Sequence, residues 1–139
     1  IHSYIHQGSR IGVLLEVNCE TDFVALTDQF RELCQEIALQ IAASAPTVVS
    51  REQIPLELLA KEREIYREVA RNEGKPEKIL DRIVEGKVEK YFAQVCLLEQ
   101  PYIRDQDKTI EELLKETIAS LGENIQIARF SRFALGEGA

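Results

Sequence analysis

The sequence predicts an α+β domain in which helices cover a three-stranded antiparallel sheet and a helical hairpin protrudes. Three observations support this. Apolar residues alternate near both ends of the chain, apolar residues at helical spacing fill the middle, and two long helical stretches meet at a tight turn. With 139 residues, 45% of them hydrophobic, the chain is long enough to bury a core. We therefore expect one domain over residues 1–139.

The first expected element is a β-hairpin. Residues 1–6 form a short candidate strand, Gly8 supplies a permissive turn, and residues 10–18 return antiparallel. Every second residue of the returning strand is apolar, which gives it one fully apolar face formed by Ile11, Val13, Leu15 and Val17.

A polar corner with an aromatic tip follows at residues 19–23. Thr27 is a natural N-cap for the next helix, which we expect over residues 28–44. The apolar stripe of that helix consists of Phe30, Leu33, Cys34, Ile37 and Ile41. A rigid strand and a capped helix thus hold Asp22 and Phe23 between them, and we expect the corner to present these side chains.

Residues 55–95 are typical of an antiparallel helical hairpin. Gly74 ends its first helix and Pro76 opens its second, and residues 50–53 before it have capping-box spacing. A narrow apolar seam is predicted along both helices, whose outer faces are mostly charged. The seam of the first helix includes Leu58, Leu59, Ile65, Tyr66, Val69 and Ala70. This arm is interpreted as a second docking element, as a dimer contact, or as a solvated hairpin packed on its own core.

The chain closes with a helix and a strand. Residues 96–103 read as extended or irregular, and a second capping box at residues 109–112 starts a helix that Gly122 ends. The last strand is expected over residues 125–135. Its alternation slips around residues 129–132, which predicts a β-bulge there.

Composition excludes several classes of function. The 17 basic and 24 acidic residues give a net charge of −7, and an acidic chain repels phosphate backbones, so no direct nucleic-acid binding is expected. No apolar run approaches the roughly 20 residues of a membrane span. Phosphate-loop, dinucleotide, serine-hydrolase and zinc-peptidase motifs are missing from the sequence. His6 and Cys19 alone suggest a thiolate–imidazole pair, but no third group to orient it is apparent, so we expect no enzyme activity.

The cysteines predict neither a metal site nor a disulfide framework. Cys19, Cys34 and Cys96 are odd in number and widely spaced, without a CxxC pair, which fits a reducing compartment. Cys34 lies on a helix stripe and reads as a small core residue. Because the chain starts at Ile1 without methionine, it is interpreted as a fragment or a processed product.

The stretch GSRIGVLLEVNCETDFVA, residues 8–25, resembles the signature of the translation elongation factor Ts family. Three further segments echo that family and extend the resemblance over essentially the whole chain, at residues 98–102, 108–116 and 133–138. Leu26 departs from the pattern, because the family usually has a basic residue or asparagine there. The resemblance implies the core, or dimerisation, domain of a short bacterial or organellar-type member, preceded in the family by a small helical domain.

The resemblance also implies a function. It implies a guanine-nucleotide exchange factor that releases GDP from elongation factor Tu and needs no cofactor of its own, since Mg²⁺ and GDP belong to the GTPase. Asp22 and Phe23 would enter the GTPase beside its magnesium site, Phe23 would wedge between helices, and Thr21 and Val24 would shape the loop. His6 stands in a segment similar to one that contacts the GTPase's later domains. Some members of the family carry two copies of such a unit in one chain, whereas this chain carries one. The resemblance therefore implies a homodimer that completes the arrangement.

Plainer interpretations stand beside these. Asp22 is also interpreted as a carboxylate that accepts hydrogen bonds from the free N–H groups at the start of a helix. Phe23 is interpreted as an ordinary aromatic residue of the core, and His6 as an exposed residue at the end of a strand. Asn18 is expected to brace the corner by hydrogen bonds to the backbone. The alternative function is a non-catalytic structural module associated with ribosomes or translation. Bacterial cytoplasm, plastid stroma and mitochondrial matrix all fit the sequence.

Overall fold

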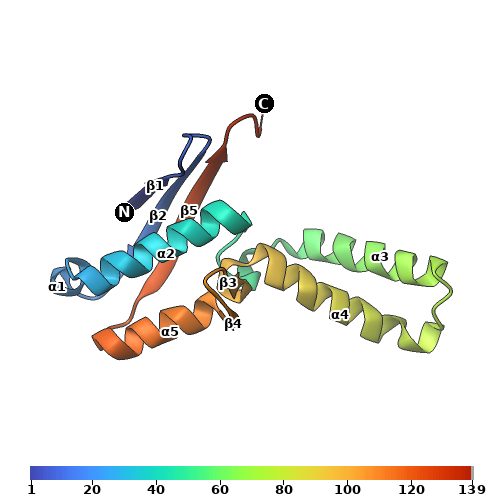
Figure 1. Cartoon of the computed structure of the whole chain (residues 1–139). Helices are drawn as coiled ribbons and strands as arrows, with labels where there is room; N and C mark the ends of the chain where they lie inside the picture. Colours follow the sequence, from blue (N-terminus) through green and yellow to red (C-terminus); the bar gives the residue numbers. More distant parts are fainter. Residues whose placement is uncertain (139) are drawn as a thin grey trace.

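The computed structural model describes residues 1–138 and shows a small sheet, helices on one of its faces, and a long helical hairpin extending from one end (Figure 1). The sheet is antiparallel with strand order β1-β2-β5. Its strands are β1 (His2–Ile5), β2 (Ile11–Asn18) and β5 (Gln126–Ala134). The predicted α+β class and three-stranded sheet are confirmed.

The predicted bulge lies next to Arg129. Strands β2 and β5 pair in one register as far as Glu16 opposite Arg129, and the register then shifts so that Val17 lies opposite Ile127. The extra residue in β5 explains why the alternation of that strand slips in the sequence.

Helix α2 (Asp28–Ser44) lies across one face of the sheet, as Figure 1 shows, and α5 (Ile110–Leu121) runs alongside it. The predicted bounds of α2 are confirmed. Its stripe is buried, and Ile37 and Ile41 are fully enclosed against the inward-facing residues of β2. The helix ends at Ala45, which adopts a left-handed conformation with φ 46°.

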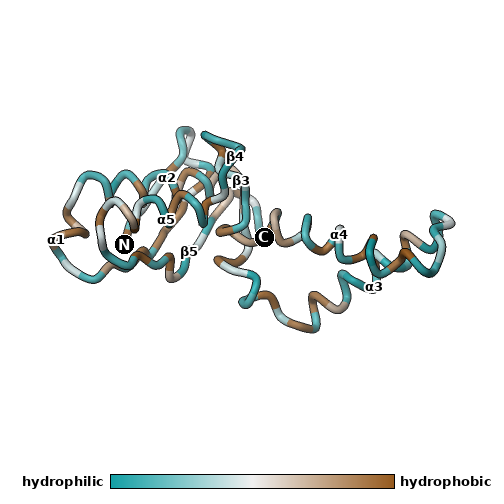
Figure 2. The backbone as a smooth tube through the Cα atoms, turned by 90° about the horizontal axis from the view of Figure 1, so that it is seen from below, coloured by the Kyte–Doolittle hydropathy of each residue, from teal (hydrophilic) through white to brown (hydrophobic). Residues whose placement is uncertain are grey.

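The hairpin consists of α3 (Leu56–Asn72) and α4 (Glu77–Val95), joined by a turn in which Gly74 has φ 81°. Figure 2 shows it extending away from the body formed by the sheet, α2 and α5. A second apolar cluster at its base contains Ile54, Val84, Val88, Phe92 and Cys96. The predicted seam is only partly buried, since three of its residues are exposed: Leu58, Ile65 and Val69.

Two buried amides join the hairpin to the body. Gln40 of α2 donates to the Gln100 side chain at 3.2 Å and accepts from the Ile103 backbone N–H at 2.9 Å. Gln100 in turn donates to the carbonyl oxygen of Gln94 near the end of α4 at 2.7 Å. Because buried amides without partners are costly, these bonds fix where the hairpin leaves the domain.

The segment predicted as extended or irregular, residues 96–103, contains a short 3₁₀ turn, η2 (Leu97–Glu99), and the extended strand β3 (Pro101–Tyr102). Strand β3 pairs with β4 (Asp105–Thr109), a strand that the sequence did not predict. Strand β4 has the sequence DQDKT, whose polar residues give no apolar alternation to detect.

Of the two capping boxes, the one at Thr109 is confirmed, because its hydroxyl accepts from the Glu112 N–H at 3.2 Å. The one at Ser50 is wrong. The Ser50 side chain makes no capping bond, and Gln53 instead accepts from the N–H of Val49 at 2.8 Å.

Candidate partner-binding site

The corner after β2 is a single-turn helix, α1 (Asp22–Ala25), held at both ends by threonine caps. The Thr21 hydroxyl accepts from the Val24 N–H at 3.3 Å. The Thr27 hydroxyl donates to the Val24 carbonyl at 2.7 Å and accepts from the Phe30 N–H at 3.2 Å. Val24 is only 5% exposed, so it shapes the corner from inside the core and offers little contact surface.

Phe23 projects from this corner into solvent. Its side chain is 81% exposed, so its interpretation as a core aromatic residue is wrong. Asp22 beside it is also exposed, and Leu26 adds a second exposed apolar side chain after the turn. An exposed phenylalanine on a rigid support gains about 1.5–3 kcal/mol when a partner buries it.

Glu123, which the sequence analysis did not identify, braces the corner. One carboxylate oxygen accepts from the backbone N–H groups of Glu20 and Thr21 at 3.2 and 3.1 Å, and the other accepts from the Thr21 hydroxyl at 2.6 Å. Glu20 returns a bond by accepting from the Asn124 N–H at 3.3 Å. The expectation that Asn18 braces the corner by hydrogen bonds to the backbone is wrong, because its side chain donates to the Glu16 side chain at 3.1 Å.

The position of Glu123 follows from the end of α5. Gly122 takes a left-handed conformation with φ 74° and donates to the Ile118 carbonyl at 2.8 Å, which stops the helix and turns the chain toward the corner. The glycine was identified in the sequence as a helix end. The carboxylate after it lies 102 residues from Thr21, so no local spacing could connect the two.

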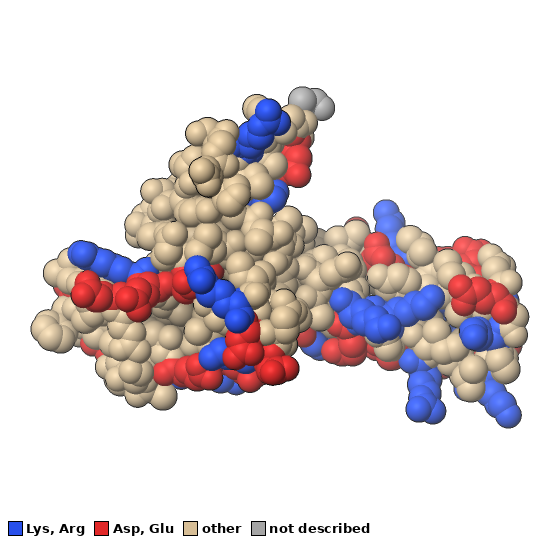
Figure 3. Space-filling view, viewed as in Figure 1, with Lys and Arg blue, Asp and Glu red and all other residues tan. Residues whose placement is uncertain are grey.

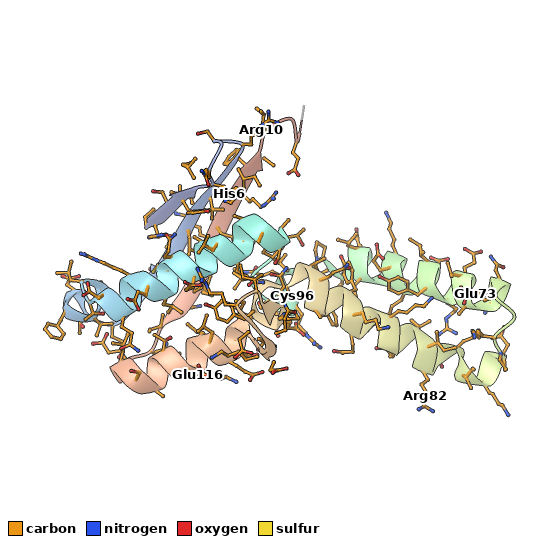
Figure 4. All side chains as sticks on the ribbon, in the orientation of Figure 1. His6, Arg10, Glu73, Arg82, Cys96 and Glu116 are labelled. Atoms are coloured by element: carbon orange, nitrogen blue, oxygen red, sulfur yellow. The ribbon has the colours of Figure 1, made fainter. Side chains whose placement is uncertain are left out.

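His6 does not belong to this site. It lies just past β1, where its N–H donates to the Ile11 carbonyl at the start of β2, and its Nδ1 is 2.7 Å from the Tyr4 hydroxyl. The corner follows the other end of β2, about 23 Å away at roughly 3.3 Å per residue. Figure 4 shows His6 high on the sheet, beyond α2. The structure therefore gathers Thr21, Asp22, Phe23 and Val24 and leaves His6 as a separate exposed position.

The cysteines act as packing residues or local donors. Burial raises the pKa of the Cys34 and Cys96 thiols to about 11, so both stay protonated at neutral pH, and the prediction that Cys34 is a core residue is confirmed. Cys19 donates to the Thr21 carbonyl at 3.2 Å and lies far from His6, which excludes a thiolate–imidazole pair.

Residues 1–138 contain no group of three histidine, cysteine or acidic side chains placed to hold a metal ion. No helix in that range is sufficiently long and apolar to cross a bilayer.

The sheet face opposite α2 is a second exposed surface. The register places Ile5, Gly12 and Phe133 in one row across the three strands, with Leu14 in the next row. Ile5, Leu14 and Phe133 are all exposed, and Phe133 is 73% exposed. Glu16 and Arg129 form an ion pair at 3.0 Å on the same face.

Comparison with known proteins places these features in a family. The family model described as Elongation factor TS matches residues 1–137. The chain is 58% identical over 138 residues to elongation factor Ts of Heliobacterium modesticaldum, covering 99% of this chain and 64% of that protein. It is 60% identical to elongation factor Ts of Thermoanaerobacter sp. and 54% identical to that of Geobacter sulfurreducens, again over 99% of this chain, and covers 68% and 64% of those proteins.

The chain thus spans about two thirds of the length of these curated relatives, from 64% to 68%. The family match extends from the first β-hairpin through the helical arm to the closing strand. It includes both the corner that carries Phe23 and the loop that braces it. This chain belongs to the elongation factor Ts family.

Proposed function

We propose that this chain is the core of a guanine-nucleotide exchange factor that promotes GDP release from elongation factor Tu during translation elongation. The observation that carries the proposal is Phe23, 81% exposed on a one-turn helix that is capped at both ends and braced from a distant loop. Family membership supports the choice of partner, and the bacterial relatives support action in a bacterial cytoplasm.

The proposed mechanism is mechanical. Mg²⁺ holds phosphate oxygens through hard ligands at near-ideal octahedral geometry, so a small displacement of the helix that supports them weakens GDP binding. A tenfold faster release requires about 1.4 kcal/mol, and burying one phenylalanine releases about 1.5–3 kcal/mol. Phe23 alone therefore supplies one or two decades of acceleration, and the remaining contacts supply the rest.

The other residues of the corner have supporting roles in this proposal. Asp22 brings an exposed carboxylate beside the partner's magnesium site, Thr21 caps the helix, and Val24 anchors it. His6 provides a separate contact with the later domains of the GTPase. Because coupling between two ligands is reciprocal, GDP weakens the grip of this chain on the GTPase by the same factor, which allows the factor to be recycled.

The direct test is a nucleotide-release experiment. Elongation factor Tu loaded with a fluorescent GDP analogue is mixed with excess unlabelled GDP, with and without the intact chain, and release is followed by stopped-flow fluorescence. We expect release to accelerate in proportion to the concentration of the chain until it saturates. Unchanged release would contradict the proposal and favour a non-catalytic structural module associated with translation.

We also propose a homodimer formed through the exposed sheet face. A two-fold axis would stack the apolar row that contains Ile5 and Phe133 on its counterpart and bring Glu16 of one copy near Arg129 of the other. The Phe133→Asp substitution should therefore convert a dimer to a monomer in sedimentation velocity, with an unchanged circular dichroism spectrum because the side chain is exposed. A native chain that sediments as a monomer at tens of micromolar would contradict this proposal.

A further inference from the structure

A row of ion pairs lies along one face of the helical hairpin. On this face Arg71 pairs with Glu77 at 2.9 Å and Arg63 with Glu85 at 3.1 Å, and an Arg67–Asp81 pair lies between them. Arg51, from the turn before α3, continues the row with Glu89 at 3.3 Å. The four acidic residues recur every four positions along α4 and therefore lie on one face of that helix. Each of them is engaged in an ion pair with an arginine.

The opposite face of the hairpin carries a row of apolar residues. The register set by the ion pairs places Val69 opposite Ile79 and Ile65 opposite Ile83. Helical periodicity puts these four residues on the other side of the seam from the ion pairs. Ile65 is 53% exposed and Val69 41% exposed, whereas Ile79 and Ile83 are half-buried, so part of this apolar row faces solvent on the arm.

A shallow groove of about 480 Å³ runs along α4 on this face, lined by Ile79, Arg82, Ile83, Gly86, Lys87 and Lys90. Gly86 has no side chain to fill the groove, and no atom of another residue lies within 4 Å of the position that its Cβ atom would take. We call these six residues the basic groove.

The cations of the basic groove are available to a partner. Arg82, Lys87 and Lys90 form no ion pair with any of the residues 1–138. Figure 4 shows Arg82 pointing away from α3, and Figure 3 shows basic side chains along the lower edge of the arm. In a chain of net charge −7, this is a local concentration of unpaired positive charge.

We propose that the basic groove binds an acidic amphipathic helix of a partner protein. The apolar floor at Ile79 and Ile83 matches the apolar stripe of such a helix, and the cationic rim matches acidic residues beside that stripe. Nucleic acid fits less well, because phosphates would meet the cations but leave the isoleucines in water. From Ile79 to Lys90 the groove runs about 17 Å, or three helical turns. This site lies on the arm, away from the corner, and is independent of the exchange function.

The test uses a designed probe. A fluorescein-labelled peptide of about four helical turns carries leucine at every third or fourth position and glutamate on both flanks of that stripe. Its control is a scrambled peptide of the same composition that has no stripe. Binding to the intact chain is measured by fluorescence anisotropy at low and high salt. We expect the patterned peptide to bind, the scrambled peptide to bind at least tenfold more weakly, and salt to weaken binding.

Matched variants locate the site. The double reversal Arg82→Glu/Lys90→Glu should lower affinity for the patterned peptide at least tenfold. The control variant Arg10→Glu/Lys115→Glu changes the net charge by the same amount at exposed positions outside the groove. It should lower the affinity for the patterned peptide less than twofold. Gly86→Leu should block the groove with its side chain, although leucine favours the helical conformation more than glycine does. The Gly86→Ala variant should bind the patterned peptide with nearly unchanged affinity.

Three results would overturn the proposal. The first is equal binding of the patterned and scrambled peptides. The second is a single-stranded RNA oligomer that binds more tightly than the patterned peptide and loses affinity in the same double reversal, which would assign the surface to nucleic acid. The third is self-association of the native chain that Gly86→Leu abolishes, which would assign the groove to a second copy.

Discussion

Replacing Phe23 with alanine is expected to slow the promoted release of GDP from elongation factor Tu about tenfold to a hundredfold, with the fold unchanged. The side chain is 81% exposed in the free protein, so its removal leaves no cavity and costs little stability. In the proposed complex the partner buries the ring and this burial drives the displacement, so we expect its loss to remove about 1.5–3 kcal/mol from that step.

Stopped-flow release of a fluorescent GDP analogue measures this effect, with thermal unfolding of each variant as the check on folding. Leu26→Ala is the matched control, since Leu26 is also exposed and apolar but follows the α1 turn, and its effect should be much smaller. A Phe23→Ala chain that folds and exchanges at full speed would remove the proposed mechanism and leave family membership unaffected.

Removing the Glu123 carboxylate should make the corner that carries Phe23 more mobile, because this carboxylate holds its backbone. Glu123→Ala deletes the acceptor of three hydrogen bonds from Glu20 and Thr21. We expect about 1–2 kcal/mol lower free energy of unfolding and roughly tenfold slower exchange, because a mobile tip must be ordered on binding. Glu123→Gln keeps an acceptor oxygen and should recover part of both losses.

Amide hydrogen exchange separates positioning from general destabilisation. In Glu123→Ala the amides of Glu20 and Thr21 should lose protection, while amides in the centre of α2 change only by the global loss of stability. Glu111→Ala, which removes an exposed carboxylate from the first turn of α5, serves as the control. Unchanged protection of Glu20 and Thr21 in Glu123→Ala would show that the carboxylate does not hold the corner.

The elements predicted correctly are those whose signals are local. The alternation in β2, the Thr27 cap, the stripe of α2 and the glycines that end α3 and α5 each depend on residues within a few positions of one another. The corner around Phe23 could be predicted for the same reason, because a strand pattern and a helix pattern flank it directly.

The errors share a physical cause as well. Strand β4 is polar because its pairing with β3 rests on backbone hydrogen bonds, which leave no trace in hydropathy. Ile65 and Val69 fit a helical stripe, yet two helices alone cannot enclose every apolar side chain that faces their seam. Periodicity shows which residues share a face but not whether anything packs against it.

The sequence alone therefore determined the family, the order of the elements and the corner that carries Asp22 and Phe23, since these depend on short-range patterns and a long matching signature. Only the tertiary structure decided that Phe23 faces solvent, that Glu123 braces it, and that one face of the arm is left open. Those facts depend on which distant segments meet when the chain folds. A carboxylate 102 residues away acts on the corner only because α5 ends beside it.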